Sequence, residues 1–328
     1  MANTDIRLGD TIIYGADDIT KSFISDFLND KDYVIAHTSG STGTPKEIKL
    51  LKNDMLISAK ATCQRFGINS NSQLLLPLSP SYIAGKMMIV RALVSGADLF
   101  IEQPSNMPIS KDYGIIDLLP IVPSQINAVL NSQYISQFKN VIIGGGAIPL
   151  AVEQEIIKSW INAYATYGMT ETCSHVALRK INGSSSHYHA LPGITFAADS
   201  RGCLIINAPE YSFKSIITND IVKIIGKDIF QWVGRYDNVI NTGGIKVYPE
   251  EIEGKLSHLI DVPFYIAGVD DEKWGTKVVL YIEATEYNKS LILNEASSIL
   301  DKFSLPKEIR LVTKFERTDS GKIKRLPL

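Results

Sequence analysis

Residues 38–46 read TSGSTGTPK, a polar, glycine-rich segment that joins the β-rich run 32–38 (DYVIAHT) to the short apolar run 47–51 (EIKLL). Two such runs around a polar segment predict a hairpin of two strands. Glycines let a loop turn its backbone N–H groups towards an anion, hydroxyls donate to phosphate oxygens, and a lysine adds positive charge. The segment therefore predicts a phosphate-binding loop made by Thr38, Ser39, Gly40, Ser41, Thr42, Gly43 and Lys46.

Two other interpretations of this loop are less favoured. A Walker A loop has the pattern G-x-x-x-x-G-K-[ST] and opens a helix, whereas here Pro45 precedes Lys46, Glu47 follows it and the next residues resemble a strand. A flexible Ser/Gly linker is the second alternative, but the embedded Pro-Lys pair between two strand-like runs argues against it. The sequence favours a phosphate loop of another type.

The composition is that of a globular protein and excludes collagen, coiled coil and disorder, because 45% of the 328 residues are hydrophobic and 21% are charged. The formal net charge of -2 gives no reason to expect nucleic acid or an anionic membrane as a partner. The apolar stretch 84–100 is interrupted by Lys86 and Arg91, and three cysteines without C-x-x-C spacing indicate neither disulfides nor a zinc site. We expect a cytoplasmic protein that holds any anionic ligand in a local site.

The order of the apolar runs predicts an α/β protein in two domains. Up to about residue 195, short strands alternate with helices, among them a helix after Asn53 that ends at Gly67, which favours a mainly parallel sheet covered on both faces. A segment rich in short strands follows. Residues 235–244 (RYDNVINTGG) are polar and end in two glycines. We therefore expect a large αβ domain over 1–235 and a small, mobile α+β domain over 236–328.

Two further segments carry residue types suited to a nucleotide. Gly144, Gly145 and Gly146 follow an expected strand, but their spacing is not the G-x-G-x-x-G of dinucleotide-binding proteins, so they indicate close approach of the backbone to a flat base. Residues 167–171 (YGMTE) combine an aromatic ring, a hydroxyl and a carboxylate, which suit a base, a phosphate and a hard cation. Taken alone, YGMTE favours a strand end followed by a helix cap, whereas its place after the phosphate loop and before GRYDN favours a nucleotide site.

Seven segments in this order resemble the acyl-adenylate-forming (AMP-binding) enzymes, and their matches extend over residues 38–325. Besides the three segments above, the resemblance rests on Asp220 in ITND, on GRYDN (234–238), on GGIKVYPEEIE (243–253) and on SGKIKR (320–325). It implies an ATP-dependent acid:CoA ligase that forms an acyl-adenylate, with ATP, Mg²⁺ and coenzyme A as cofactor or co-substrates. Its other partner would be a small carboxylic acid.

The resemblance also implies a role for each matching residue. Tyr167 and Gly168 would lie at the nucleotide, Asp220 and Arg235 at the ribose and phosphate, and Glu171 would hold magnesium. Lys46, Thr170, Glu171 and Lys322 would be the catalytic residues. The small domain would rotate about Asp237, and Gly243 and Gly244 would face the acyl group when CoA attacks.

The chain departs from the family pattern at four places, one of which is the missing Gly-Tyr of the segment before Asp220. The phosphate loop begins at residue 38, so the region before it is shorter than the family usually has. Asn219 stands where the family usually has glycine, and Glu316 stands where proline is common. None of these changes removes a group that would take part in the chemistry.

The acid is indicated by Arg91, a lone cation in the apolar helical run 83–96. A buried guanidinium needs an anion, either a carboxylate of the protein or one of the ligand. The surrounding segments resemble the o-succinylbenzoate:CoA ligases of menaquinone biosynthesis, which implies that Arg91 and Ser174 contact an aromatic dicarboxylate. A ligase for another aryl or fatty acid and a noncatalytic nucleotide-binding homologue remain as alternatives. His187 and His189 lack a nearby third ligand, so a metal site there is not favoured.

Overall fold

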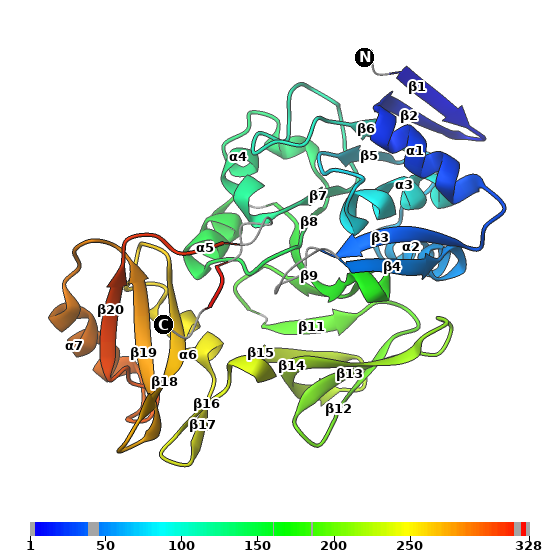
Figure 1. Ribbon diagram of the computed structural model, residues 1–328. Coiled ribbons are helices and arrows are strands. Elements are labelled where there is room, and N and C mark those ends of the chain that lie inside the picture. Colours follow the sequence, from blue (N-terminus) through cyan, green and yellow to red (C-terminus); the bar gives the residue numbers. More distant parts are fainter. Residues whose placement is uncertain (1–3, 39–45, 160, 185, 318–322, 326–328) are drawn as a thin grey trace.

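The computed structural model describes residues 4–38, 46–159, 161–184, 186–317 and 323–325, with only the backbone of Thr38 and Lys46 (Figure 1). The first sheet has the strand order β1-β2-β6-β5, in which β2, β6 and β5 are parallel and β1 is antiparallel. Its strands are β1 (Thr4–Leu8), β2 (Thr11–Ala16), β5 (Gln73–Leu76) and β6 (Asp98–Ile101). The helices that accompany it are α1 (Asp18–Leu28), α2 (Lys52–Phe66) and α3 (Ile83–Ser95).

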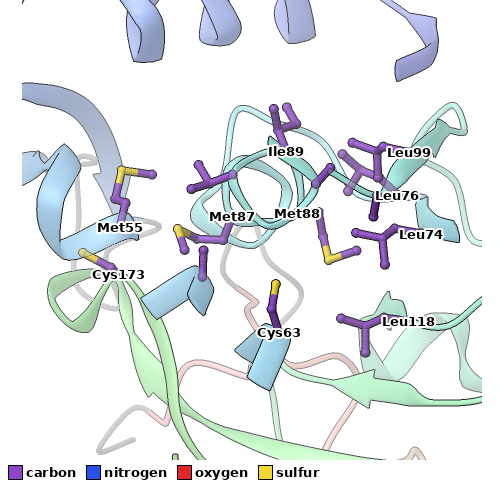
Figure 2. Close-up of a cluster of buried hydrophobic side chains, with 14 of the residues drawn as sticks. Met55, Cys63, Leu74, Leu76, Met87, Met88, Ile89, Leu99, Leu118 and Cys173 are labelled. Atoms are coloured by element: carbon purple, nitrogen blue, oxygen red, sulfur yellow. The ribbon is translucent and has the colours of Figure 1, made fainter. Parts of the chain in front are cut away.

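Residues 87–92 of helix α3 are all buried, which explains the almost continuous apolar sequence there. Figure 2 looks along this helix and shows Met87, Met88 and Ile89 pointing away from it in different directions into one cluster. Met88 points towards Leu74 and Leu76, while Cys63 of α2 lies below the helix in this view. Arg91 lies on the same helix, so its side chain extends from an apolar core.

The hairpin expected around the phosphate loop is confirmed. β3 (Tyr33–Thr38) pairs antiparallel with β4 (Lys46–Leu51), and Thr38 lies opposite Lys46 in the register. Helix α2 follows directly, and Gly67 ends it in the left-handed conformation at φ 68°. The expected cap at Asn53 is wrong: β4 runs straight into the helix, so the cap position is Leu51 and Asn53 is already helical.

The second sheet has nine strands in the order β12-β13-β14-β15-β11-β10-β9-β8-β7. β7, β8 and β9 are parallel, and every pairing from β9 to β12 is antiparallel. The parallel strands are β7 (Leu119–Ile121), β8 (Val141–Ile143) and β9 (Ala163–Met169), with α4 (Ile126–Leu130) and α5 (Leu150–Lys158) between them. The antiparallel strands are β10 (Ser174–Lys180), β11 (His187–Ala190), β12 (Thr195–Ala198), β13 (Cys203–Ala208), β14 (Lys214–Gly226) and β15 (Ile229–Arg235). The strand-rich segment thus extends the parallel sheet through β9 and β10 instead of forming a sheet of its own.

The residues after Arg235 build a separate group of elements, drawn in yellow to red at the left of Figure 1. A short turn, η4 (Tyr236–Asn238), leads into the hairpin β16 (Ile240–Thr242) and β17 (Ile245–Val247). Next come α6 (Pro249–Leu256), β18 (Phe264–Asp271), β19 (Gly275–Glu283), α7 (Lys289–Ile299) and β20 (Glu308–Val312). One apolar cluster joins them, and all its buried members lie between Ile240 and Ile309. The division into domains 1–235 and 236–328 stays a prediction.

The remaining composition-based expectations concern cysteines and membranes. Cys63, Cys173 and Cys203 are all free and buried, as the absence of a disulfide pattern predicts. Within the described ranges, no helix is both long and apolar enough to span a lipid bilayer.

Candidate active site

The glycines of residues 144–146 lie at the carboxyl end of β8, beside the end of β9. A Cβ atom on Gly144 would lie 2.5 Å from Oγ1 of Thr166, so this position accepts no larger side chain without movement. Gly145 has φ +83°, which favours glycine, and both Gly145 and Gly146 are exposed. Ligands of open α/β sheets bind outside the carboxyl ends of the strands. The segment therefore offers exposed backbone for a flat ligand at the expected place.

Asp220 on β14 is the centre of a polar cluster at the neighbouring strands. Its carboxylate accepts hydrogen bonds from the hydroxyl of Tyr167 at 2.7 Å and from the indole Nε1 of Trp232 at 3.2 Å. The guanidinium of Arg235 lies 3.5 Å away, because Arg235 is the register partner of Asp220 on β15. Sheet pairing thus brings together three residues that the sequence predicted for one nucleotide, and it adds Trp232, which sequence reasoning missed.

The ring of Tyr167 packs edge-on against Phe230 and Tyr188, with centroids 5.1 and 5.8 Å away. Burial, followed by the charge of Asp220 and their hydrogen bond, raises the pKa of the Tyr167 hydroxyl above its usual range. The phenol therefore stays protonated and donates. It holds the Asp220 carboxylate in place for a further donor such as a ribose hydroxyl.

The turn between β9 and β10 has an unusual backbone. The short 3₁₀ helix η3 (Thr170–Thr172) is followed by Cys173 and Ser174, at φ 58° and 133°, values rare for residues with a side chain. The hydroxyl of Thr172 lies 2.7 Å from the carbonyl of Ser174 and 3.0 Å from the backbone N–H of Met169. Strained residues of this kind persist where surrounding contacts fix them, often at functional sites.

Gly168 makes this turn possible. A Cβ atom on it would lie 2.2 Å from the carbonyl oxygen of Ser174 and 2.5 Å from Cα of His175, both backbone atoms that cannot swing away. Glycine at the second position of YGMTE is thus required by the close approach of β10. Thr170 is half-buried and Glu171 is exposed at the same turn.

The phosphate hairpin lies against this turn, because both β3 and β4 contact η3. The register places Thr38 and Lys46 at the end of this hairpin where residues 39–45 join the two strands. Ser39, Gly40, Ser41, Thr42 and Gly43 lie outside the described residues, as does Lys322. The roles expected for these residues and for the Lys46 side chain stay predictions.

Arg91 is 1% exposed, and no carboxylate of the described residues lies within 4 Å of its guanidinium. Its Nη2 donates to the hydroxyl of Ser174 at 3.0 Å, and its Nη1 lies 3.5 Å from the sulfur of Met88. Its Nε has no hydrogen-bond partner. Burial lowers the pKa of Arg91 to about 10, which still leaves it charged at neutral pH. A carboxylate of the protein was one of the two partners expected for Arg91, and the described chain places none beside it.

His175 lies next to Arg91 and is 5% exposed. Its ring nitrogens lie 3.3 Å from the hydroxyl of Ser174 and 3.3 Å from that of Thr62 on α2. Burial, and then the charge of Arg91, lowers its pKa well below the usual range, so the ring is neutral. His175 follows YGMTE closely in the sequence, which made it a candidate for the lining of the nucleotide pocket, and nothing in the sequence pointed to Thr62.

The residues predicted for the hinge and for CoA lie elsewhere. Asp237 in η4 is exposed, 3.2 Å from Nη2 of Arg235 and 3.4 Å from the side-chain nitrogen of Asn219. Gly243 and Gly244 form the β16–β17 turn at φ 57° and 80°. The backbone N–H of Gly243 donates to the carbonyl of Trp274, and Figure 1 shows this hairpin apart from the end of β9. The structure thus does not bring these two glycines to Arg91 or Glu171.

The metal ligand expected from the sequence is a single exposed carboxylate. No group of three or more His, Cys, Asp or Glu side chains in the described chain could hold a metal ion. Mg²⁺ in nucleotide sites usually keeps several waters and takes one or two carboxylates together with substrate phosphates. Glu171, beside the phosphate hairpin, fits that arrangement and does not fit a closed protein cage.

Comparison with known proteins agrees with this geometry. Among curated proteins, the chain is 22% identical to 2-succinylbenzoate–CoA ligase of Oceanobacillus iheyensis over 92% of its own length and 70% of the relative. It is 26% identical to the enzyme of the same name from Listeria monocytogenes, over 89% of its own length and 68% of the relative. A solved o-succinylbenzoate CoA synthetase of Bacillus subtilis, in complex with its acyl-adenylate, superposes with a TM-score of 0.76 at 18% identity and shares the fold, over 89% of this chain and 67% of that one.

A second solved structure is closer in sequence and length. It is an acyl-CoA synthetase (AMP-forming)/AMP-acid ligase II-like protein from Dyadobacter fermentans, 33% identical with a TM-score of 0.63, over 93% of this chain and 91% of that one. The family model described as AMP-binding enzyme matches residues 20–200, more than half of the chain. The motifs, the fold and both kinds of similarity lead to one conclusion: the chain belongs to the AMP-binding enzyme family.

Proposed function

We propose that this protein is an ATP-dependent, AMP-forming acid:CoA ligase that activates o-succinylbenzoate. The observation that carries the choice of acid is Arg91, a buried cation without a carboxylate partner in the described chain, which reaches Ser174 beside the nucleotide motif. An aromatic dicarboxylate has one carboxylate to activate and a second that needs a cationic anchor. The names of the curated relatives support the same acid.

In the first step, a carboxylate oxygen of the acid attacks the α-phosphorus of ATP. The new O–P bond forms as the bond to the β-phosphate oxygen breaks, and pyrophosphate leaves with the electron pair. Negative charge must be neutralised at the phosphates, for which we propose Lys46, Lys322 and the hydroxyl of Thr170. Asp220 and Arg235 would bind the ribose and phosphate, and residues 144–146 with Tyr167 would bind the base.

Magnesium would be held by Glu171 together with phosphate oxygens of ATP. It would supply positive charge that stabilises the triphosphate and the leaving pyrophosphate. Glu171 is exposed, so its carboxylate is available to a hydrated cation.

In the second step, the thiol of coenzyme A attacks the acyl carbon of the adenylate. The C–S bond forms, the bond from the acyl carbon to the phosphate oxygen breaks, AMP leaves and the thiol proton passes to solvent. We propose that domain 236–328 turns about Asp237 between the steps, since the Gly243–Gly244 turn lies apart from the first-step residues here (Figure 1). Such domain motions commonly separate the half-reactions of an enzyme.

The test is acid-dependent exchange between ATP and labelled pyrophosphate on the purified protein. We expect exchange with o-succinylbenzoate and at least tenfold less with benzoate, which lacks the second carboxylate. Equal exchange with benzoate, or faster exchange with a fatty acid, would show that the substrate is another acid. No exchange with any acid, while ATP still binds, would make it a noncatalytic homologue.

A further inference from the structure

Four buried or half-buried polar groups form a row from α3 across β10 to α2. Nη2 of Arg91 donates to Oγ of Ser174 at 3.0 Å, and that oxygen lies 3.3 Å from Nδ1 of His175. Nε2 of His175 lies 3.3 Å from Oγ1 of Thr62, which donates to the helix carbonyl of Ser58 at 3.1 Å. The row connects a guanidinium, which can only donate, with a carbonyl, which can only accept.

The two ends determine the direction of every bond between them. If the hydroxyl proton of Thr62 goes to Ser58, then Nε2 of His175 must carry a proton and donate it to Thr62. Nδ1 is then bare and accepts the hydroxyl proton of Ser174, whose oxygen accepts from Arg91. In the opposite tautomer, the Ser174 proton has no acceptor among the side chains that the structure describes. Only the first arrangement gives each proton between neighbouring groups of the row an acceptor within the row.

The surroundings keep the imidazole ring of His175 neutral. His175 is 5% exposed and follows Ser174 directly, next to the Arg91 charge, so a second positive charge there is costly. A neutral ring with a bare Nδ1 is the form that can take the Ser174 proton.

We propose that His175 is a positioning residue for acid recognition: it holds the Ser174 hydroxyl as an acceptor towards Arg91 and so aims the guanidinium. The Nε–H of Arg91, which has no partner, and its Nη1, which has only a sulfur nearby, are then left for the distal carboxylate of the acid. This inference rests on the proposed function. It makes Ser174 an orienting group for Arg91.

Two substitutions separate this role from simple filling of space. The carbonyl oxygen of asparagine can replace Nδ1, whereas the amide nitrogen of glutamine can replace Nε2. We expect His175→Gln, which keeps the contact to Thr62, to raise the KM for o-succinylbenzoate about 10-fold and that for ATP less than twofold. His175→Asn should stay within about threefold of wild type for both, as should the control His189→Gln at an exposed histidine.

Glutamine behaving like wild type while asparagine fails, or equal changes in both KM values, would overturn the positioning role. A second measurement tests the row without any activity. In protein labelled with ¹⁵N-histidine, the ring signals lost in His175→Gln identify His175, and we expect a protonated Nε2 and a bare Nδ1 at pH 7. A protonated Nδ1 would overturn the proposal. Inactivity of the wild type with o-succinylbenzoate would contradict the proposed function alone, and the spectrum would still decide whether the row exists.

Discussion

At the scale of residues, Arg91 is the group whose surroundings demand an external anion. It is buried in an apolar helix, and its described neighbours include Ser174, the sulfur of Met88 and the neutral His175 ring. A guanidinium in such a place is retained at a cost in folding free energy that a ligand carboxylate would offset.

Arg91→Leu should raise the KM for o-succinylbenzoate by about 10- to 100-fold, the loss of a charge-assisted hydrogen bond of roughly 1.5–3 kcal/mol. The KM for ATP should hardly change, because the Asp220 cluster lies on β9, β14 and β15, whereas Arg91 lies on α3. Steady-state kinetics with each substrate varied in turn measures both values. Parallel loss of ATP binding, or an unfolded variant, would mean that Arg91 is structural, and Arg91→Lys should then be the milder change in thermal stability.

His175 should also make stability depend on pH. Its pKa in the folded state is below the usual 6.5, so below pH 6.5 the unfolded chain binds the proton and the folded chain does not. Stability is therefore fully present above pH 6.5 and falls as the pH drops towards the lowered pKa. Urea unfolding of wild type and His175→Gln at about pH 7 and about pH 5 measures the difference. A variant that loses as much stability as wild type would contradict this.

Sequence reasoning at this scale found groups whose surroundings were local. Arg91 was evident because the cost of burying its charge is visible within one apolar helix. Gly168 was evident as part of a motif. Thr62 and Trp232 were not found, because their partners lie 113 and 12 residues away and a single threonine or tryptophan carries no directional signal. Their contacts depend on how α2 packs on β10 and how β15 pairs with β14.

At the scale of elements, the proposed rotation between the half-reactions depends on η4. It is a single turn between β15 and β16, and its Asp237 is held only by exposed contacts to Arg235 and Asn219. Surface contacts of this kind contribute little free energy, so they allow rotation.

Asp237→Pro should leave pyrophosphate exchange intact and reduce thioester formation. Proline fixes φ near about −65° and restricts Tyr236, which hinders rotation about this residue. Both half-reactions are measured on the same preparation. Asp237→Ala is the matched control, because it removes the contacts to Arg235 and Asn219 without stiffening the backbone, and it should retain both. Equal loss of both half-reactions in the proline variant would indicate general damage.

Elements with strong local signals were predicted well, and their ends less so. The hairpin β3–β4 and the end of α2 at Gly67 follow from turn residues and periodicity. The start of α2 was placed wrongly at Asn53, because a favourable capping residue was outweighed by β4 continuing directly into the helix. The fusion of β9 with the antiparallel strands depends on long-range pairing that no local pattern encodes.

At the scale of the whole molecule, the C-terminal segment is hydrogen-bonded to helix α6. Arg325 forms two 2.7 Å hydrogen bonds with the carboxylate of Glu253 on α6. Arg317 and Ile323 pair as an isolated antiparallel bridge. Arg317, Ile323 and Arg325, which lie on either side of residues 318–322, are thereby held to the C-terminal elements.

Lys322→Ala should slow adenylate formation by roughly 100-fold or more, the loss of one preorganised charge donor. Given prepared acyl-AMP and CoA, the same variant should form thioester at close to the wild-type rate. Lys324→Ala is the matched control: its side chain is partly exposed, 3.9 Å from Glu316, and its loss should leave adenylation nearly intact. Single-turnover experiments that show both half-reactions impaired alike, or Lys324→Ala as the worse variant, would contradict domain alternation.

The indole of Trp232 gives the molecule an optical reporter for these events. Its N–H is bonded to the carboxylate predicted to bind the ribose, so an arriving nucleotide alters the polarity around an emitting ring. Trp274 lies in the other region, against Phe303 and beside the Gly243 turn. In a Trp160→Phe background, with Trp232 or Trp274 also replaced by phenylalanine in turn, emission from the one indole left reports the predicted nucleotide pocket or the region proposed to rotate, so two stopped-flow traces can time binding and rotation without an attached dye.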